Sequence, residues 1–351
     1  MAEPAPDLSA HISTRISTHV TLDAVAPDDE AALRDWFALV TAARSHDAPS
    51  DPPPCWVGHR ARLVAGRPGR ADRAWLARAG HEVVGVAELS LPTTDNLDNA
   101  FGDLTVAPRH RRRGVGRLLL TRLAEQARTA GRTRLIVEAP GPLDEPGPAA
   151  AFLAATGATR ALTEQRRRLP LPPADPAGLD ALAEEARAAA TGYELVQWVG
   201  DTPQEWREDI AVLTARMSTD VPHGDLHITP EHYDAARVAA LDAARRARGL
   251  RCTVTAARGP DGRLAAYTMI LQTSSVAWHA DQGDTLVAPE HRGRRLGMRV
   301  KLANLERVRR DSPRLTVVDT YNADANPWMV SINEAMGFRP YDRLGEWELD
   351  L

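Results

Sequence analysis

The sequence predicts a mixed α/β fold with a mostly antiparallel central sheet, present twice in tandem along the chain. Three observations support this prediction. The chain repeats itself at a domain-sized interval. Each copy alternates strand-like and helix-like segments, and an Arg/Gly-rich turn separates a strand from an amphipathic helix at the same place in both copies.

The internal repeat is the strongest of these observations. Several segments match in order at an offset of 180 or 181 residues, which indicates two homologous domains rather than a solenoid of short repeats. The matching pairs are Val106–Gly116 with Val287–Gly297, His81–Leu91 with Gly262–Gln272, Arg134–Val137 with Arg314–Val317, and Gly157 with Gly337.

Each copy has the same predicted order of elements. An opening strand and a helix precede a variable polar region and an antiparallel pair of strands. A fourth strand then ends at a Val-Ala-Pro triplet, and a helix, a fifth strand, a short helix and a closing strand follow. The bounded segments of the two copies are Thr18–Ala24 and Tyr193–Val199, Glu30–Ala43 and Gln204–Met217, Arg73–Leu91 and Arg251–Gln272, and Leu135–Glu138 and Leu315–Asp319.

A proline-rich segment between the copies predicts a linker. Proline lacks an N–H donor and clashes with a preceding helical turn, so Leu169–Pro176 cannot hold a regular helix, whereas Gly178–Ala190 is typical of a short Ala-rich helix. We therefore predict a flexible tail over residues 1–17, an N-terminal domain over 18–170, a linker over 171–192 and a C-terminal domain over 193–351.

Composition excludes several classes of protein. The 351 residues carry 43 Lys and Arg against 47 Asp and Glu, so no basic excess indicates a nucleic-acid partner; Lys301 is the only lysine. Cys55 and Cys252 lie outside any metal-binding or disulfide spacing, and we expect no metal. With no secretory signal pattern and no run of 18 apolar residues, we expect a cytoplasmic protein without a membrane partner.

The Arg/Gly-rich turn has the features of an anion-binding site. It spans Arg111–Gly116 in the first copy and Arg292–Gly297 in the second, each time before a helix with an apolar stripe. A helix N-terminus offers unpaired N–H groups, glycine lets the backbone approach phosphate oxygens, and arginines add charge-assisted hydrogen bonds. The alternative is a solvated basic helix start, but the duplication favours a diphosphate site that is neither a Walker loop nor a GxGxxG turn.

The segment Arg111–Gly116 resembles the R/Q-x-x-G-x-G/A acyl-CoA loop of the GCN5-related N-acetyltransferases (GNATs). The resemblance covers essentially the whole chain, twice over. The chain is similar to the tandem GNAT proteins of actinomycetes, above all to those of antibiotic gene clusters of the clavulanic acid type and, more distantly, to mycothiol synthase. In the second copy, Gln282–Val287 carries the likeness to the antibiotic-cluster type. The resemblance implies splayed fourth and fifth strands with acyl-CoA, most often acetyl-CoA, between them.

The resemblance also implies which residues hold the acyl-CoA. The pantetheine arm would lie along the fourth strand like an added strand, and the diphosphate on the turn. In the first copy these residues are Leu104, Thr105, Val106, Arg111, Arg112, Arg113, Gly114, Val115, Gly116 and Arg117. In the second copy they are Thr285, Leu286, Val287, Arg292, Gly293, Arg294, Arg295, Leu296, Gly297 and Asn326.

The two copies depart from the family pattern in different ways. Arg295 occupies the place of the first loop glycine. If that position needs a positive φ or a close approach to the ligand, Arg295 weakens binding of the diphosphate, and otherwise it adds a cation. The family's second motif, N-x-x-A-x-x-L-Y-x-x-L-G-F, has Asn333 in place of Tyr in the second copy, and Pro146 and Leu153 replace its Asn and Tyr in the first. We infer that the first domain is an acyl-CoA-binding scaffold and the second carries the transfer; the alternative is that both work independently.

Transfer to an amine requires a base, an oxyanion donor and a stabilised thiolate. We expect the Val287 N–H to stabilise the oxyanion. With the usual Tyr absent, Asn333 would hydrogen-bond the sulfur, or water or Tyr321 would supply the proton. The candidate bases Asp284, Asp319 and His279 fall on strands near the splay, where pairing with arginines or a structural role is the alternative for each. No Cys or Ser stands in a nucleophile setting, which favours direct transfer in a ternary complex.

The predicted function is acyl transfer to the amine of a small metabolite in secondary metabolism or antibiotic biosynthesis. The loop Asp220–Leu226, with two acids and a His, is a candidate for contact with a cationic acceptor. The alternative function is that of a non-catalytic acyl-CoA-binding or regulatory protein, for which the missing Tyr in both copies is the evidence.

Overall fold

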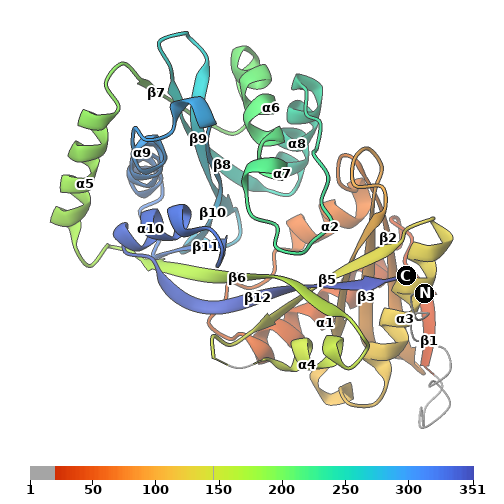
Figure 1. The fold of residues 1–351 in the computed structure, drawn as a ribbon. Coiled ribbons are helices and arrows are strands. Elements are labelled where there is room, and N and C mark those ends of the chain that lie inside the picture. Colours follow the sequence, from red (N-terminus) through yellow and green to blue (C-terminus); the bar gives the residue numbers. More distant parts are fainter. Residues whose placement is uncertain (1–19, 145) are drawn as a thin grey trace. The chain divides into compact units, whose positions relative to one another are not determined.

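The computed structural model describes residues 20–144 and 146–351, so the predicted tail over residues 1–17 lies outside the described part. Contacts divide the chain into two units (Figure 1). Unit 1 comprises the chain through Leu162 together with Asp225–His227 and Leu344–Leu351, and unit 2 comprises Thr163–Gly224 and Ile228–Arg343. No helix in the described ranges has both the length and the apolar character that a membrane span needs.

Unit 1 is a sheet with helices on its faces. Its strands follow the order β1-β2-β3-β4-β5-β12; β1 to β4 pair antiparallel, and β4 pairs with β5 in parallel. The elements are β1 (Val20–Ala24), α1 (Glu30–Asp47), α2 (Trp56–Ala65), β2 (Arg70–Ala79), β3 (Glu82–Pro92), β4 (Asn99–Val106), η1 (Pro108–His110), α3 (Val115–Thr129), β5 (Arg134–Gly141), α4 (Pro148–Ala154) and the end of β12 (Arg339–Asp350).

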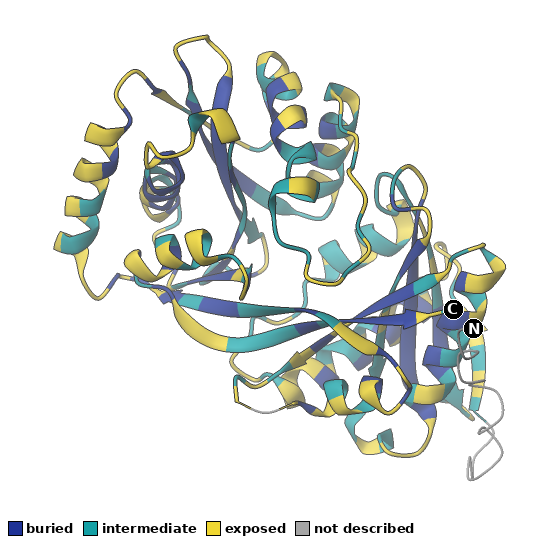
Figure 2. Cartoon of the chain, in the orientation of Figure 1, coloured by how far each residue is buried: buried dark blue, intermediate teal, exposed yellow. Residues whose placement is uncertain are grey.

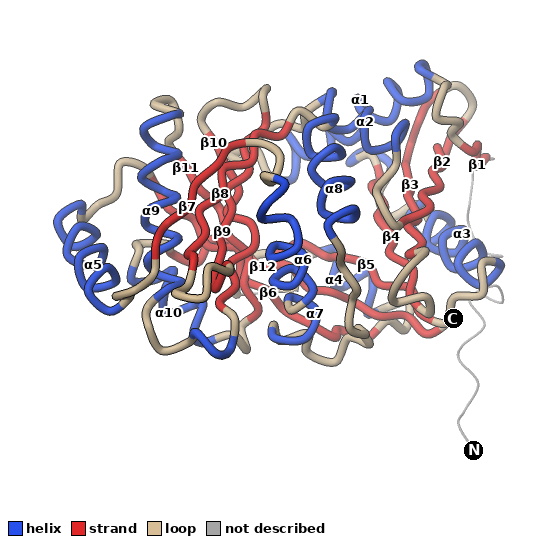
Figure 3. Tube along the Cα trace, turned by 90° about the horizontal axis from the view of Figure 1, so that it is seen from above, coloured by secondary structure: helices blue, strands red, loops and turns tan. Residues whose placement is uncertain are grey.

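Unit 2 repeats this architecture in the strand order β12-β6-β11-β10-β9-β8-β7. Figures 1 and 3 show α5 and α9 on one face of its sheet and α6 and α8 on the other. The elements are β6 (Thr159–Pro170), α5 (Pro176–Ala189), β7 (Glu194–Val199), η2 (Gln204–Trp206), α6 (Arg207–Ala215), α7 (Met217–Asp220), α8 (Ala235–Ala247), β8 (Leu250–Arg258), β9 (Leu264–Thr273), β10 (His279–Val287), η3 (Pro289–His291), α9 (Leu296–Asp311), β11 (Val317–Ala323), α10 (Pro327–Ala335) and the start of β12.

The predicted mixed, mostly antiparallel fold is confirmed in both units. The apolar stripe of α3 buries Leu119, Leu120 and Leu123 against the sheet, and each such side chain contributes about 1.5–3 kcal/mol. The central strands are buried along most of their length, whereas the outer side of α5 is exposed (Figure 2).

The compact units and the two sequence copies differ at the closing strands. Strand β6 begins in unit 1 and ends in unit 2, and β12 begins in unit 2 and ends in unit 1. Each unit therefore contains part of the strand that closes the other copy in the sequence. The predicted linker helix is α5, which packs Ala186 into the core of unit 2.

Two local predictions need correction. The variable polar regions contain α2 and α8, which sequence periodicity missed because α2 buries no residue and α8 buries only Val238 and Asp242. The fifth strands are also shifted: pairing with the fourth strands makes Val317, not Arg314, the counterpart of Arg134. Residues 314–316 precede β11 in a connection that is longer than the one before β5.

Candidate active site

A gap opens between the fourth and fifth strands of each unit. In unit 1, β4 pairs with β5 only over Asn99–Gly102, yet it continues to Val106 against β3. In unit 2, β10 pairs with β11 only over His279–Gln282, a bulge follows, and Thr285–Val287 pair with β9. The described fourth strands therefore leave one backbone edge without a strand partner beyond the pairing, which confirms the predicted splay.

The turn of unit 1 presents a cluster of unpaired backbone donors at one end of this gap. Its left-handed residues are Arg112 (φ 62°) and Gly114 (φ 88°), and Gly114 is the N-cap of α3. Across the described chain, the backbone N–H groups of residues 112–117 find no acceptor, and the first bond of the helix runs from the Leu118 N–H to the Gly114 carbonyl. This is the geometry of an anion-binding nest.

The turn of unit 2 has the same two left-handed positions with glycine and arginine exchanged. Gly293 (φ 77°) corresponds to Arg112, and Arg295 (φ 53°) corresponds to Gly114. The position of Arg295 therefore does require a positive φ, and arginine adopts it at a cost of roughly 1–2 kcal/mol. The backbone path is preserved, so the second turn keeps the shape of the first.

Arg112 in the turn of unit 1 also adopts a positive φ, and replacing it with glycine should relieve the backbone strain there. We expect Arg112→Gly to raise the free energy of unfolding by about 0.5–1 kcal/mol, because a left-handed residue without Cβ is unstrained. Arg113→Gly is the matched control, since Arg113 has no positive φ, and it should lower stability slightly through the entropy of the unfolded chain. Urea denaturation of both variants checks this, and a loss of stability in both would contradict it.

The first arginine of each turn clamps the turn to the protein. Arg111 donates from Nε to the Val106 carbonyl at 3.2 Å and binds Asp47 through both Nη atoms at 2.7 and 2.6 Å. Arg292 repeats this with the Val287 carbonyl at 3.2 Å and with Asp220 at 2.6 Å. These two guanidinium groups hold the turn in place.

The other arginines differ between the units. In unit 2, Arg294 bonds the Tyr193 hydroxyl and Arg295 bonds Glu185 at 2.5 Å. In the described part of unit 1, the side chains of Arg112, Arg113 and Arg117 have no hydrogen-bond or ion-pair partner. The turn of unit 1 therefore offers more uncommitted positive charge to an anion.

Asp284 lies in the bulge of β10, on the face of the sheet that α6 and α8 cover. It is half-buried and accepts a hydrogen bond from the Tyr267 hydroxyl at 3.2 Å. Burial raises its pKa, against the opposing effects of Arg245 and of the Tyr267 hydrogen bond. A raised pKa makes a carboxylate a stronger base, which suits it to accept a proton from an ammonium group.

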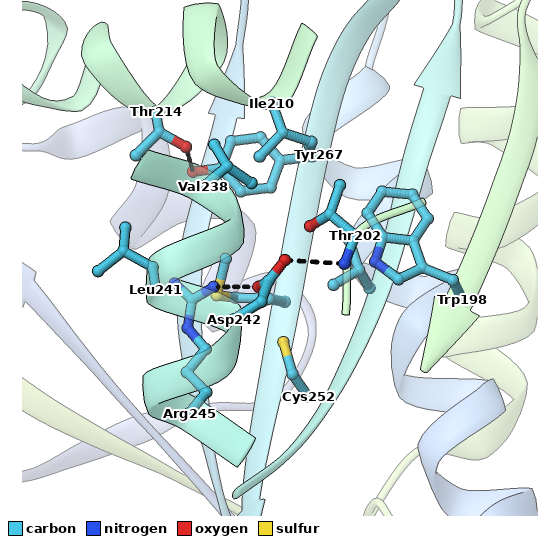
Figure 4. Close-up of a pocket in the computed structure, with 12 residues that line it drawn as sticks. Trp198, Thr202, Ile210, Thr214, Val238, Leu241, Asp242, Arg245, Cys252 and Tyr267 are labelled. Atoms are coloured by element: carbon cyan, nitrogen blue, oxygen red, sulfur yellow. Dashed lines mark hydrogen bonds and ion pairs between the residues drawn. The ribbon is translucent and has the colours of Figure 1, made fainter. Parts of the chain in front are cut away.

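An enclosed cavity lies behind Tyr267 in the same face (Figure 4). Its volume of about 20 Å³ is enough for one water molecule. Thr202 N–H and Arg245 both donate to Asp242 there, at 2.8 and 3.0 Å, while the buried Trp198 Nε1 has no partner in the described chain. Tyr267 connects this polar interior to Asp284.

The other two candidate bases, Asp319 and His279, form a buried pair. His279 Nε2 lies 3.0 Å from Asp319 Oδ2, and Arg168 binds both Asp319 oxygens at 2.7 Å. Burial opposes the charge on Asp319, but the hydrogen bonds from Arg168 and His279 outweigh it and lower the pKa of Asp319 to about 2. A carboxylate held in this way is a weak base, so Asp284 is the better placed of the three.

Lowering the pH should reduce the stability of unit 2, because Asp319 becomes protonated. Its folded-state pKa lies below the unfolded value, so its stabilisation is present above about pH 4 and is lost as the pH falls toward 2. We expect a loss of about 2 kcal/mol across this window. Asp319→Asn should flatten the acid limb of a urea-unfolding series, and an unchanged limb in that variant would contradict the assignment.

The remaining predicted residues lie on both sides of the gap. Tyr321 follows the part of β11 that pairs with β10, and it pairs with Arg166 of β6. It is 41% exposed, and partial burial raises its pKa to about 12. Asn333 is fully buried and donates from Nδ2 to Asn322 Oδ1 at 2.5 Å. Asn326 is the N-cap of α10, where its Oδ1 accepts from the Met329 N–H at 3.2 Å. In the predicted acceptor loop, Asp220 forms an ion pair with Arg292.

Sequence reasoning missed several polar residues near Asp284 and in unit 1. The Tyr233 hydroxyl donates a hydrogen bond to Glu231 at 3.0 Å. Burial is the main cause that raises the pKa of Tyr233 to about 12; the negative charge of Glu231 is the second cause, and that of Asp284 has a smaller effect. In unit 1, the buried Glu88 is ion-paired with Arg62 of α2 and with Arg67. No motif marked these residues, and the arginine partners of Glu88 come from other segments of the chain.

Comparisons with known proteins agree with this geometry. The profile of the Acetyltransferase (GNAT) family matches residues 32–142. A tandem GNAT protein from the clavulanic acid biosynthesis pathway, solved without AcCoA, is 34% identical; the match covers 94% of this chain and 98% of that chain, with a TM-score of 0.79.

Other solved structures share the fold at low identity. A GCN5-related N-acetyltransferase from Sphaerobacter thermophilus is 14% identical, with 94% of this chain and 95% of that chain covered and a TM-score of 0.62. A GCN5-related glucosamine N-acetyltransferase region of a fungal multi-domain GH3 β-N-acetylglucosaminidase is 15% identical, covers 95% of this chain and 38% of that chain, and has a TM-score of 0.62. No curated protein matches the sequence significantly.

Proposed function

This chain belongs to the GCN5-related N-acetyltransferase (GNAT) family as a tandem member, and from that premise we propose that unit 1 retains an acyl-CoA as a scaffold while unit 2 transfers an acetyl group to a small amine. Members of this family are acyl-CoA-dependent acyltransferases. The 34% identity to a tandem GNAT protein from the clavulanic acid pathway supports a role in antibiotic biosynthesis.

The observation that carries the proposal is the row of unpaired backbone N–H groups at residues 112–117. They adjoin an unpaired strand edge at Leu104–Val106, so a diphosphate on the turn and an extended amide-bearing arm along the strand would satisfy both. A side chain at Gly116 would meet Phe152 no closer than 3.5 Å. The chain itself therefore does not demand a glycine there, which supports a requirement set by a bound ligand.

Unit 2 carries the residues suited to chemistry. The acyl-CoA would supply the thioester, and the Val287 N–H on the free edge of β10 would donate to its carbonyl oxygen as negative charge develops. Asp284, whose pKa burial raises, would take the proton of the acceptor ammonium. The carboxyl groups of Asp281, Asp284 and Glu231 on this side favour a cationic acceptor.

In unit 1 the residue that corresponds to Asp284 is Asp103, which is exposed. The face of β3 near its gap holds the ion pairs of Glu88 with Arg62 and Arg67, and Leu153 replaces the family Tyr. Since Asn333 replaces the Tyr in unit 2 as well, the second candidate function is acyl-CoA binding without catalysis. The two functions differ in turnover.

Native mass spectrometry of the purified protein tests the first part. We expect one acyl-CoA molecule to be retained, and a protein that carries none and binds none on addition of acetyl-CoA would contradict the scaffold role. Release of free CoA thiol from acetyl-CoA in the presence of a panel of small amines tests the second part. Tight binding without thiol release over the whole panel would favour the non-catalytic function.

A further inference from the structure

The two units differ chemically where the helix after the turn packs against the gap. Both helices begin at the left-handed N-cap of the turn, so Lys301 of α9 corresponds to Leu120 of α3. The same capping bond ends both short helices, from the Ala158 N–H to the Leu153 carbonyl and from the Phe338 N–H to the Asn333 carbonyl. Asn333 therefore corresponds to Leu153.

These positions are buried in both units. Leu120 is 1% exposed and Leu153 is 2% exposed, and both belong to the apolar core of unit 1. Lys301 is 1% exposed and Asn333 is 0% exposed, although a buried ammonium or amide is costly without partners. Unit 2 has thus replaced two core leucines with polar groups, one of them the only lysine of the chain.

The polar groups of unit 2 lie at the wall of the gap. Asn333 binds Asn322, which lies two residues after Thr320, the last residue of β11 that pairs with β10. Asn333 Oδ1 has no donor in the described chain. At the fourth strand, the Thr285 and Thr268 hydroxyls bond at 2.7 Å where unit 1 pairs Leu104 with Ala87. Unit 2 therefore has an amide pair and a hydroxyl pair at positions where unit 1 has leucine and alanine.

Lys301 is placed to reach this gap. It lies one turn after Gly297, whose Cα faces Ile332 of α10 and Val287 of β10. Helical side chains point back toward the N-terminus, so the Lys301 side chain extends toward that corner. Its Nζ lies 5.7 Å from the centre of the Phe338 ring, and within residues 20–144 and 146–351 it has no hydrogen bond or ion pair.

We propose that Lys301 is the proton donor to the departing coenzyme A sulfur in unit 2, in place of the absent tyrosine. This rests on the proposed function. As the acceptor nitrogen bonds to the carbonyl carbon, the C–S bond breaks and its electron pair stays on sulfur. One proton passes from Lys301 Nζ to the sulfur and leaves a neutral amine, which solvent reprotonates. The proton lost by the acceptor nitrogen goes to Asp284.

The acidity of Lys301 supports this role. Burial lowers its pKa to about 7, so the ammonium form is populated near neutral pH. A thiol has an ordinary pKa of about 8.5, and the transfer of a proton from Lys301 to a thiolate is therefore downhill. Asn333, whose amide cannot protonate sulfur, would orient it through a hydrogen bond.

The single lysine allows a direct test. A chain labelled with [13Cε]lysine gives one side-chain signal, whose pH titration reports Lys301 alone. We expect CoA to raise the titration midpoint by at least about one pH unit relative to S-methyl-CoA, because only CoA forms a thiolate beside the ammonium. Equal midpoints with the two bound ligands would overturn the proposal.

Kinetics of the full chain give a second test. Lys301→Met should lower kcat for CoA release from acetyl-CoA by about 10²- to 10⁴-fold with little change in KM. Lys301→Arg should be equally slow, since its guanidinium cannot give up a proton at this pH, whereas a purely electrostatic role would be rescued by arginine. Leu120→Met in unit 1 is the matched control and should keep full activity.

The outcomes separate the two proposals. Wild-type kcat in Lys301→Met overturns the role of Lys301 and leaves the acetyltransferase function intact. An active wild type with an inactive Lys301→Met that still binds CoA supports both. A wild type that neither binds CoA nor shows any change in the lysine signal overturns the proposed function and this inference with it.

Discussion

A chain carrying Gly114→Val is expected to bind CoA about 10²- to 10⁴-fold more weakly at unit 1. Gly114 has φ 88° and ψ −11°, a region that a β-branched residue avoids, so valine should move the turn. Loss of two charge-assisted N–H bonds to the diphosphate, each worth about 1.5–3 kcal/mol, accounts for the size of the effect. Isothermal titration with CoA measures it.

The control for this variant lies at the end of the same helix. Gly131 also has a positive φ (75°) and an added Cβ there would meet nothing within 4 Å, but it is remote from the turn in sequence. Gly131→Val should strain the backbone without changing CoA affinity. Unchanged retention of acyl-CoA by Gly114→Val would refute the assignment of the turn.

Replacing Lys301 with methionine should stabilise the fold by about 4–5 kcal/mol at pH 7 and below. The folded-state pKa of about 7 lies below the unfolded value near 10.4, so folding has to desolvate a charge or release a proton. Below pH 7 both states are protonated and the penalty is complete. Between pH 7 and 10.4 the unfolded state binds more protons, so wild-type stability rises with pH through this window.

Urea denaturation from pH 6 to 10 measures this effect. The stability of Lys301→Met should vary less with pH and converge with that of the wild type near pH 10. The reverse substitution, Leu120→Lys, should introduce the same penalty and pH slope into unit 1. Parallel curves for wild type and Lys301→Met would show that Lys301 keeps an ordinary pKa in the folded chain. A gain of stability together with a loss of activity is the trade-off expected of a functional residue.

The sequence by itself determined the duplication, the fold and the position of the two Arg/Gly turns. These properties are local or periodic: an offset of 181 residues, an Arg/Gly turn between a strand and a stripe helix, and the residue types that such a turn needs. The helices α2 and α8 and the register of the fifth strand escaped prediction, because they bury few residues or depend on pairing between distant segments.

Only the tertiary structure decided what the individual polar side chains do. Asp319, His279 and Asp284 are all candidate bases in the sequence, but Arg168 from another strand binds Asp319, whereas burial raises the pKa of Asp284 against the opposing hydrogen bond from Tyr267. In the sequence, Lys301 looks like any lysine on a helix, and only the packing of the folded chain shows that it is buried. Charge and pKa depend on the neighbours that folding brings together, and those neighbours are set by contacts over a hundred residues or more, as between Arg168 and Asp319.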